Sequence, residues 1–333
     1  NWMAGSQYVY SFGKCIFMPA DLTAGIEFNQ DKLEDNMWGY HRTVDQKVNI
    51  GSAFFQNEWK NEHWGFLIGG RLDKHNLIDH VIFSPRANLR YNPTENINLR
   101  FSYSSGFRAP QAFDEDLHVE NVGGNVAMVE LADNLKEERS QSLSASADIY
   151  HRFGAFQVNF LVEGFYTKLS DVFALTDGEI VDGILTRTRY NAPGARVMGL
   201  TLEGKMAYLT KFQLQAGITL QQSHYSEPHV WNKEAPAVKK MMRTPNTYGY
   251  FTATYTPIKP LSIALSGTYT GSMLVPHEPV PGFLEKPITV NTKDFFDIGL
   301  KAAYDFKLYK SMNLQVNAGV QNIFNAYQND FDK

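Results

Sequence analysis

Apolar and polar residues alternate one by one through much of the chain. The segment 97–104 reads Ile, Asn, Leu, Arg, Phe, Ser, Tyr, Ser, and the segments 212–220, 261–266 and 314–320 follow the same pattern. Successive side chains of a β-strand point to opposite faces, so this two-residue period indicates strands rather than helices. The polar partners are mostly Ser, Thr, Asn and Gln, which suits a strand with one wet face and one apolar face.

Segments of this kind predict about fourteen strands. Many exceed the mean soluble strand of about 5–6 residues and reach the roughly 9–11 residues that cross a bilayer at a tilt. The predicted strands are 7–17, 22–32, 45–59, 63–75, 83–91, 97–105, 140–153, 155–175, 186–209, 212–224, 244–256, 261–272, 293–306 and 313–325.

The connections between these segments are of two kinds. Short turns rich in Pro, Gly, Asn and Asp lie at 18–21, 92–96, 153–154 and 256–260, and these residue types favour tight turns. Outer-membrane barrels combine short periplasmic turns with longer extracellular loops. The sequence therefore predicts an all-β fold, a transmembrane antiparallel up-and-down β-barrel. The long polar connections are expected at about 33–44, 106–139, 176–185, 225–243 and 273–292.

The sequence argues against several other classes of protein, through its lack of repeats and long apolar runs, its net charge and its cysteine content. A soluble propeller would repeat a blade motif about every 40–50 residues, and the sequence contains no such repeat. No run of about 18 apolar residues encodes a transmembrane helix. The formal net charge of −4 and the lack of a long Lys/Arg block argue against a nucleic-acid partner. The single cysteine, Cys15, excludes an intrachain disulfide.

Five strings of residues, in the same order along the chain, resemble TonB-dependent outer-membrane receptors, chiefly those of the Bacteroides group. They span most of the sequence, and the ordered set is more specific than any one of them. The resemblance implies a barrel of about 22 strands whose lumen holds a separate N-terminal plug domain. The strings are FFQNEWK at 54–60, GGRLDKH at 69–75, SPRANLRYNP at 84–93, YSSGFRAP at 103–110 and GVQNIFN at 319–325.

The chain departs from the pattern of this family at both ends. No plug sequence or energy-coupling box precedes the first predicted strand, and the expected closing aromatic strand does not follow the last one. We therefore expect residues 1–333 to form a single β-barrel domain fragment, with about 14 of about 22 strands. The N-terminal plug and the final strand are expected to be absent from it.

The resemblance implies active import across the outer membrane. The expected ligand is a metal chelate such as a ferric siderophore, with uptake energised by the TonB complex through the missing plug. Cobalamin, haem, a glycan or a peptide stay open as ligands, and a passive porin-type barrel stays open as a class. Outer-membrane lipids and a surface lipoprotein are further expected partners, and no cofactor is expected. Because GxSxG and HExxH are both missing, we do not expect an enzyme.

The connection at 106–139 holds the densest group of chemically useful side chains, namely Arg108, Asp114, Glu115, Asp116 and His118. Clustered carboxylates can bind a hard cation such as Ca²⁺ through oxygen ligands, or they can meet a cationic group of a ligand. Acidic runs in exposed loops more often serve solubility, and the spacing of an EF-hand is missing. Arg108 is expected to orient the loop against carboxylates of the barrel rather than to bind the ligand.

A second group lies at the 225–243 connection and consists of His224, His229 and Trp231. Imidazoles can ligate iron, copper or haem, and aromatic rings can pack on a planar or catecholate ligand. His and Trp are also common on long surface loops, so the plainer interpretation is favoured and the identity of any bound metal stays open.

Overall fold

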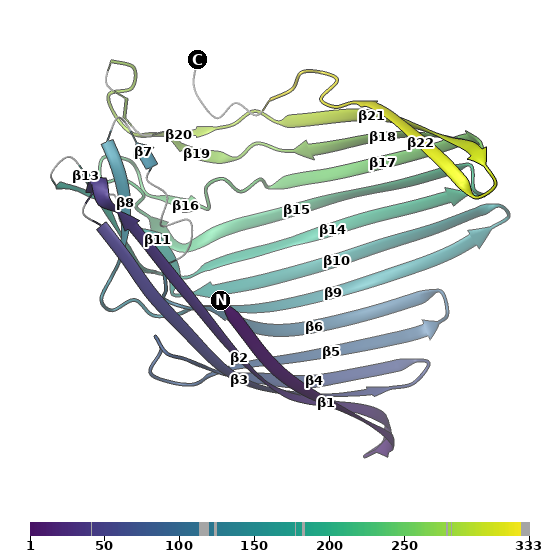
Figure 1. Ribbon diagram of the computed structural model, residues 1–333, viewed down its shortest axis with the longest axis horizontal. Coiled ribbons are helices and arrows are strands. Elements are labelled where there is room, and N and C mark those ends of the chain that lie inside the picture. Colours follow the sequence, from purple (N-terminus) through teal and green to yellow (C-terminus); the bar gives the residue numbers. More distant parts are fainter. Residues whose placement is uncertain are drawn as a thin grey trace.

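The computed structural model describes residues 1–40, 42–112, 120–122, 125–176, 178–181, 184–277, 279–280 and 282–327. Fourteen long strands in this part of the chain form one curved sheet (Figure 1). They are β1 (Trp2–Cys15), β2 (Met18–Met37), β3 (Arg42–Lys60), β4 (Trp64–His75), β5 (Ile82–Thr94), β6 (Ile97–Arg108), β9 (Glu138–Phe153), β10 (Phe156–Ser170), β14 (Ala195–Tyr208), β15 (Phe212–His229), β17 (Thr247–Ile258), β18 (Leu261–Thr270), β21 (Phe295–Tyr309) and β22 (Met312–Val320).

These long strands pair antiparallel in chain order, from β1 at one edge of the sheet to β22 at the other. Each of the fourteen predicted segments corresponds to one of them, which confirms the all-β prediction. The sheet is open, because β1 pairs only with β2 and β22 pairs only with β21. No helix in the described ranges is long and apolar enough to cross a membrane.

Short strands that the sequence pattern did not resolve as separate elements lie in or beside the long connections. A second sheet has the order β11-β13-β8-β7, with β12 also paired to β13, and β8 and β13 run parallel. The pair β19-β20 and the short strand β16, which pairs antiparallel with β15, complete the set. The bounds are β7 (Glu120–Val122), β8 (Asn125–Leu131), β11 (Val172–Leu175), β12 (Glu179–Val181), β13 (Ile184–Ala192), β16 (Val238–Lys240), β19 (Leu274–His277) and β20 (Ile288–Asn291), and η1 (Trp38–Tyr40) is a 3-10 turn.

Two predicted segments were therefore too long. The segment 155–175 divides at Asp171 into β10 and β11, and the segment 186–209 divides after Ala192 into β13 and β14. Asp171 has a positive φ of 54°, a left-handed conformation that does not continue a strand. The alternation is interrupted at both junctions, by Ser170-Asp171 at the first and by Pro193-Gly194 at the second. Pro-Gly is a turn signal, so the second break was visible in the sequence, although the prediction did not divide the segment there.

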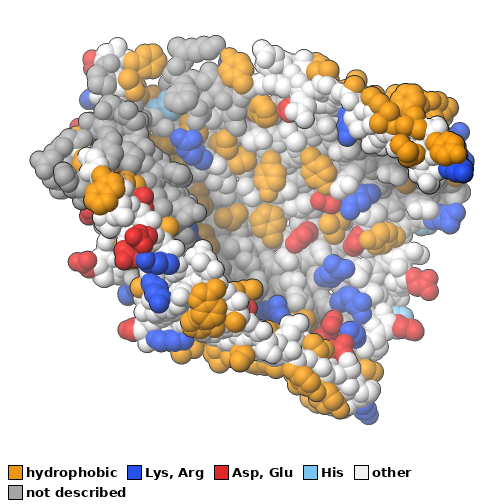
Figure 2. Space-filling model, viewed as in Figure 1, with side chains coloured by type: hydrophobic (Ala, Val, Ile, Leu, Met, Phe, Trp, Pro, Cys, Tyr) orange, Lys and Arg blue, Asp and Glu red, His pale blue; other side chains and the backbone are white. Residues whose placement is uncertain are grey.

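The two faces of the large sheet differ in chemistry. One face carries exposed apolar side chains such as Ile26, Ile68 and Phe160, which are 65 %, 57 % and 47 % exposed. The opposite face is hollowed and carries charged and polar side chains (Figure 2). We call the first the outward face and the second the hollow face. An apolar surface of this extent is unfavourable in water and suits a lipid environment.

The ends of the strands define two rims. Tight hairpins at one end join β9 to β10, β14 to β15 and β21 to β22, and we call this end the turn rim (Figure 1). The short strands and long connections gather at the other end, which we call the loop rim. Aromatic side chains stack near the turn rim, where the Phe156 ring lies 5.4 Å from that of Phe153 and 4.7 Å from that of Tyr208.

Candidate ligand-binding mouth

The hollow face is held together by a charged cluster on β2, β3 and β4. Arg71 donates from Nε to Asp73 Oδ1 at 2.8 Å and from Nη2 to Ser52 Oγ at 2.7 Å and Glu27 Oε1 at 3.2 Å. Ser52 Oγ in turn donates to Asp73 Oδ1 at 2.6 Å. The Asp73 side chain is only 4 % exposed, and such a buried carboxylate needs a cationic partner. The cluster fixes a polar wall leading to the loop rim.

Residues 109–112 are anchored where they leave β6. His75 is fully buried, accepts at Nδ1 from the Leu77 backbone N–H at 3.0 Å, and donates from Nε2 to Gln111 Oε1 at 3.2 Å. Gln46 exchanges two hydrogen bonds with the backbone of Ala112, of 2.8 and 3.1 Å. Burial lowers the pKa of His75, because removal from water disfavours the imidazolium ion. The neutral ring fits both of its hydrogen bonds.

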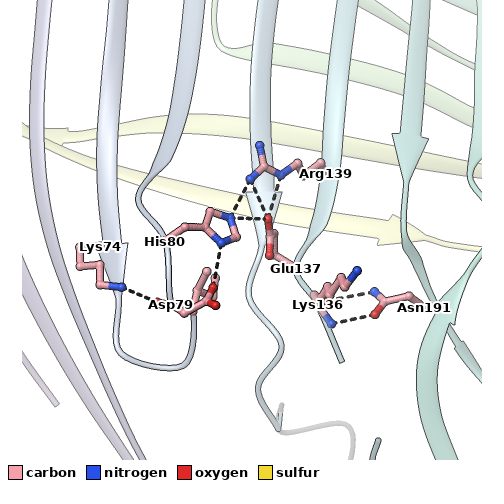
Figure 3. Close-up of polar contacts among 8 residues, drawn as sticks. Lys74, Asp79, His80, Lys136, Glu137, Arg139 and Asn191 are labelled. Carbon is pink, nitrogen blue, oxygen red and sulfur yellow. Dashed lines mark hydrogen bonds and ion pairs between the residues drawn. The ribbon is translucent and has the colours of Figure 1, made fainter. Parts of the chain in front are cut away.

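A small apolar core lies beside this anchor. Ile78 and Ile82 are buried against Ala109, and Phe107 packs on them. Lys74 donates from Nζ to the Ile78 carbonyl at 2.7 Å (Figure 3). The 76–81 connection therefore folds against the end of β6 instead of extending into solvent.

His80 links the same connection to the start of β9 (Figure 3). Its Nδ1 lies 3.0 Å from Asp79 Oδ1, and its Nε2 lies 3.1 Å both from Glu137 Oε1 and from Arg139 Nη2. Arg139 donates to Glu137 Oε1 from Nη2 at 2.7 Å and from Nε at 2.9 Å. A neutral ring accepts from Arg139 at Nε2, whereas a protonated ring donates to Glu137, so the two forms use different partners.

His80 and Glu137 in this contact both have shifted pKa values. The hydrogen bond to Asp79 and then that to Glu137 raise the pKa of His80 above its usual value. Burial is the largest single influence on the pKa of Glu137 and raises it. The hydrogen bonds and positive charge of Arg139, together with hydrogen bonds from the backbone and from His80, lower the pKa by more than burial raises it. The pKa of Glu137 is therefore lowered, and its carboxylate stays ionised at neutral pH.

Asn191 of β13 connects the second sheet to the large one (Figure 3). Its Oδ1 accepts from the Lys136 backbone N–H at 2.7 Å, while its Nδ2 donates to the Lys136 carbonyl at 3.0 Å and to the Asp171 carbonyl at 2.8 Å. One amide thus satisfies backbone groups of the segments that precede β9 and follow β10.

Arg108 is the last residue of β6 and lies at the loop rim, on the hollow face. It pairs with Glu138 of β9. Its guanidinium carbon is 5.6 Å from the centroid of the Phe173 ring, and that of the buried Arg189 is 5.9 Å from the same ring. Two guanidinium groups on one aromatic ring make a cationic region at the loop rim. The other predicted members of this group, Asp114, Glu115, Asp116 and His118, lie outside the described residues.

The second predicted group is divided between the two faces. His224 pairs across strands with Arg196, on the outward face. His229 instead packs its ring 4.8 Å from that of Tyr225, which pairs with Ala195 on the hollow face. Burial lowers the pKa of His229. Trp231 is 9 % exposed, and its indole N–H has no hydrogen-bond partner among the described residues.

The described residues contain no cluster of three or more His, Cys, Asp or Glu side chains arranged to hold a metal ion. The arrangement instead offers cationic, aromatic and hydrogen-bonding groups around an open hollow. Such groups suit a bulky polar or anionic ligand.

A wide antiparallel sheet with an apolar outward face, a polar hollow face and elaborated connections at one rim is the wall of a membrane-spanning β-barrel. Residues 2–323 match the family model of the TonB-dependent receptor-like β-barrel, so the chain belongs to this family of outer-membrane proteins. No curated protein matches the chain at the sequence level.

Several solved structures share the fold. The siderophore receptor PirA of Acinetobacter baumannii has 16 % sequence identity and a TM-score of 0.69, with 97 % of this chain and 50 % of that chain covered. A mutant ferric enterobactin receptor of Pseudomonas aeruginosa has 19 % identity and a TM-score of 0.69, with 97 % and 48 % covered. The FrpB iron transporter of Neisseria meningitidis has 16 % identity and a TM-score of 0.68, with 98 % and 52 % covered. The chain thus spans about half the length of each.

Several residues of the mouth were not singled out in the sequence. Arg71 and Asp73 lie in one of the family-like strings, but their partners Ser52 and Glu27 are 19 and 44 residues from Arg71. His80 and Glu137 are 57 residues apart. Local spacing carries no signal for such contacts, and only the pairing register of the strands brings them together.

Proposed function

We propose that the chain forms part of the wall and mouth of an outer-membrane active importer for a metal chelate, with a ferric siderophore as the first candidate. Membership of the TonB-dependent receptor family supports the proposal, and three neighbours of the same fold are named as siderophore or iron receptors and transporters. Transport rather than catalysis is the proposed activity. The TonB complex, acting through a plug domain, is the proposed energy source, and a surface lipoprotein is a proposed further partner.

The proposal rests on one observation: the polar hollow face leads to a group of cationic and aromatic side chains at the loop rim. The wall cluster around Arg71 keeps the hollow compatible with water, and Arg108 and Arg189 flank Phe173 at the loop rim. Catecholate-type chelates of iron are anionic and aromatic, so guanidinium groups and rings are complementary to them. The sequence alone favoured a loop-orienting role for Arg108, but its guanidinium lies over Phe173 at the loop rim, and Arg108 is therefore proposed as a ligand contact. His118, His229 and Trp231 are proposed as further contacts, and the acidic residues 114–116 are proposed for a cation or a cationic group of the ligand.

A binding screen of the full-length receptor tests this function. Ferric catecholate and hydroxamate siderophores, haem and cobalamin are titrated separately, and we expect one siderophore class to bind with a Kd of about 1 µM or tighter. Tight binding of haem or cobalamin alone would replace the proposed ligand while keeping the import function. If the receptor binds none of these ligands, a glycan or a peptide becomes the proposed ligand.

Uptake by cells distinguishes an energised importer from a passive porin-type barrel. Accumulation of the radiolabelled chelate that binds is measured in cells with and without a functional TonB complex. We expect uptake to be lost without TonB, while binding to the cell surface is retained. Uptake that continues unchanged without TonB would indicate passive diffusion.

Substitution of Arg108 tests the mouth itself. Arg108→Ala is expected to weaken binding of the chelate by about tenfold, because a charge-assisted contact is removed. Arg152→Ala is the matched control, since Arg152 lies near the opposite end of β9, at the turn rim. Equal affinity of both variants and the unmodified receptor would exclude Arg108 as a contact.

A further inference from the structure

Basic and imidazole side chains form a transverse row on the outward face near the loop rim. Lys168 of β10 pairs with Arg196 of β14, Arg196 pairs with His224 of β15, and His224 pairs with Lys240 of β16. Directly paired positions of an antiparallel sheet share a face, with neighbouring strands about 4.8 Å apart. We call these four residues the basic row. It spans about 14 Å along the surface.

The basic row holds the only charged or imidazole side chains at the outward positions of β10, β14 and β15. From the turn rim upward, these positions carry Phe, Val, Phe, Val, Gly and Tyr on β10 and Tyr, Met, Gly, Leu, Leu and Met on β14. On β15 they carry Phe, Leu, Ala, Ile, Leu and Gln. The glutamates of β10 and β14, Glu163 and Glu203, are at hollow-face positions.

Among the described residues, no acidic side chain forms an ion pair with the row. Lys168, Arg196 and Lys240 take part in none of the ion pairs formed among the described residues. The side chains of Lys168 and Arg196 are exposed. Three cations at one level, without carboxylates, make an anion-binding surface.

The position of the row corresponds to the headgroup level of a membrane. The apolar outward residues of β10 run from Phe156 to Tyr166, about 33 Å along the strand at roughly 3.3 Å per residue. With a strand tilt of about 40°, this distance gives an apolar band about 25 Å tall, the height found in outer-membrane barrels. Lys168 is the next outward residue. Because longer loops mark the extracellular side, the row lies at the outer leaflet.

A groove lies directly below the row, on the membrane side. It has a volume of about 870 Å³, and its lining includes Leu143, Ala145, Gly164, Tyr166 and Leu200. None of its lining residues is charged. Gly164 forms an open part of the floor, because a Cβ built there would meet no atom within 4 Å. Tyr166 and Lys168 follow Gly164 at successive outward positions of β10, so the groove leads toward the row.

We infer that the basic row and this groove together bind one phosphate-bearing lipid of the outer leaflet. The phosphate is held by Lys168, Arg196 and Lys240 through charge-assisted hydrogen bonds, and an acyl chain lies over Gly164. The groove is continuous with the apolar outward face, where the surrounding molecules are lipids, and its depth matches the acyl region. A free phosphate ion would fill the row but not the groove. The site depends on the membrane location of the chain and not on the proposed transport.

Native mass spectrometry of the full-length receptor in mild detergent tests the inference. The probes are phosphatidic acid, diacylglycerol with the same acyl chains, and inorganic phosphate. We expect the receptor to retain phosphatidic acid and neither of the other probes. Combined Lys168→Gln and Arg196→Gln substitution should weaken retention of phosphatidic acid by about tenfold, through loss of two cations. Gly164→Leu should weaken it by about fivefold, because the new side chain occupies the groove.

Two control variants separate the site from general effects. Gly204→Leu adds the same side chain on the outward face of β14, where a Cβ also meets no atom within 4 Å, but Gly204 is not part of the groove. Lys211→Gln removes a cation from the turn between β14 and β15. Both should retain phosphatidic acid, and far-UV circular dichroism checks that all variants are folded. Unchanged retention in either test variant, equal loss in the controls, or equal retention of diacylglycerol or inorganic phosphate would overturn the inference.

Discussion

At the scale of single residues, the wall of the hollow depends on a few charged side chains with several partners each. Arg71 satisfies Asp73, Ser52 and Glu27 at once, and Asp73 and Ser52 are both buried. Loss of one member of such a cluster leaves buried polar groups without partners, which costs more than loss of an exposed ion pair.

Arg71→Ala is expected to lower the free energy of unfolding by about 2–3 kcal/mol, because Asp73 and Ser52 lose their donor. Lys32→Ala is the control, since Lys32 and its partner Glu34 are each more than half exposed, with 55 % and 54 %. Its effect should stay below about 0.5 kcal/mol. Urea titration of the receptor in detergent, followed by circular dichroism, measures both. Similar costs for the two variants would contradict the special role of the cluster.

The contact of His80 makes the 76–81 connection sensitive to pH. Because the pKa of His80 is raised on folding, its stabilising contribution is complete below the unfolded value near 6.5 and is lost as the pH rises through the folded value. Glu137 has a lowered pKa, so its contribution is present above about 4.3 and is lost only in acid. The contact between His80 and Glu137 should therefore be strongest between about pH 4.3 and about pH 6.5.

Hydrogen exchange of residues 76–81 checks this expectation. After correction for intrinsic rates, we expect less protection at pH 8.5 than at pH 5.5 in the unmodified protein. His80→Gln should remove this difference, since glutamine does not titrate. A pH dependence that persists in His80→Gln would assign it to another group.

At the scale of elements, the sequence predicted long strands well and short ones poorly. Alternation over ten or more residues, bounded by tight turns such as 153–154, is a strong local signal. The strands β11 and β12 have four and three residues, too few to show a period. The parallel pairing of β8 with β13 joins segments more than fifty residues apart, as in Val126 with Ile184. No local pattern encodes that contact.

The hydrogen bonds of the Asn191 side chain are predicted to stabilise the attachment of the second sheet to the large sheet. Asn191→Ala removes three hydrogen bonds to backbone groups of Lys136 and Asp171, and local opening should become easier by about 2–3 kcal/mol. Hydrogen exchange at residues 132–137 and 171–175 measures this change. Asn317→Ala, which removes one 3.3 Å contact to Gln315, should leave these segments unchanged. Equal exchange in both variants would exclude the amide as the attachment.

At the scale of the whole molecule, the alternating pattern determines which face meets lipid. It correctly predicted an apolar face and a polar face, and the family-like strings predicted the right family. The pattern could not separate His224, on the outward face, from His229, whose ring lies with Tyr225. These residues are close in sequence, and an irregular register lies between them. The single-domain fragment without plug or final strand, and the Bacteroides-type resemblance, stay predictions.

The two faces of the same wall should tolerate an added charge to different extents. Ile218→Arg places a cation on the outward face of β15 and is expected to lower the free energy of unfolding from lipid by about 2–4 kcal/mol. Thr252→Arg places it on the hollow face of β17, where Thr252 pairs with Gln215, and should cost less than about 1 kcal/mol. Denaturant titration of the receptor in lipid vesicles compares them. Equal costs would contradict the assignment of the faces.

The pairing of β9 with β10 is unbroken from Phe153 and Phe156 at the turn to Arg139 and Ser170 at the far end. Adding one amino acid inside either strand would rotate everything beyond it, so that serines would enter the lipid and leucines the water. Adding two would restore the original orientation. Length variation within this wall should therefore be confined to even steps, while the connections at the loop rim are free to grow by any number, which leaves recognition open to change while the membrane fit is preserved.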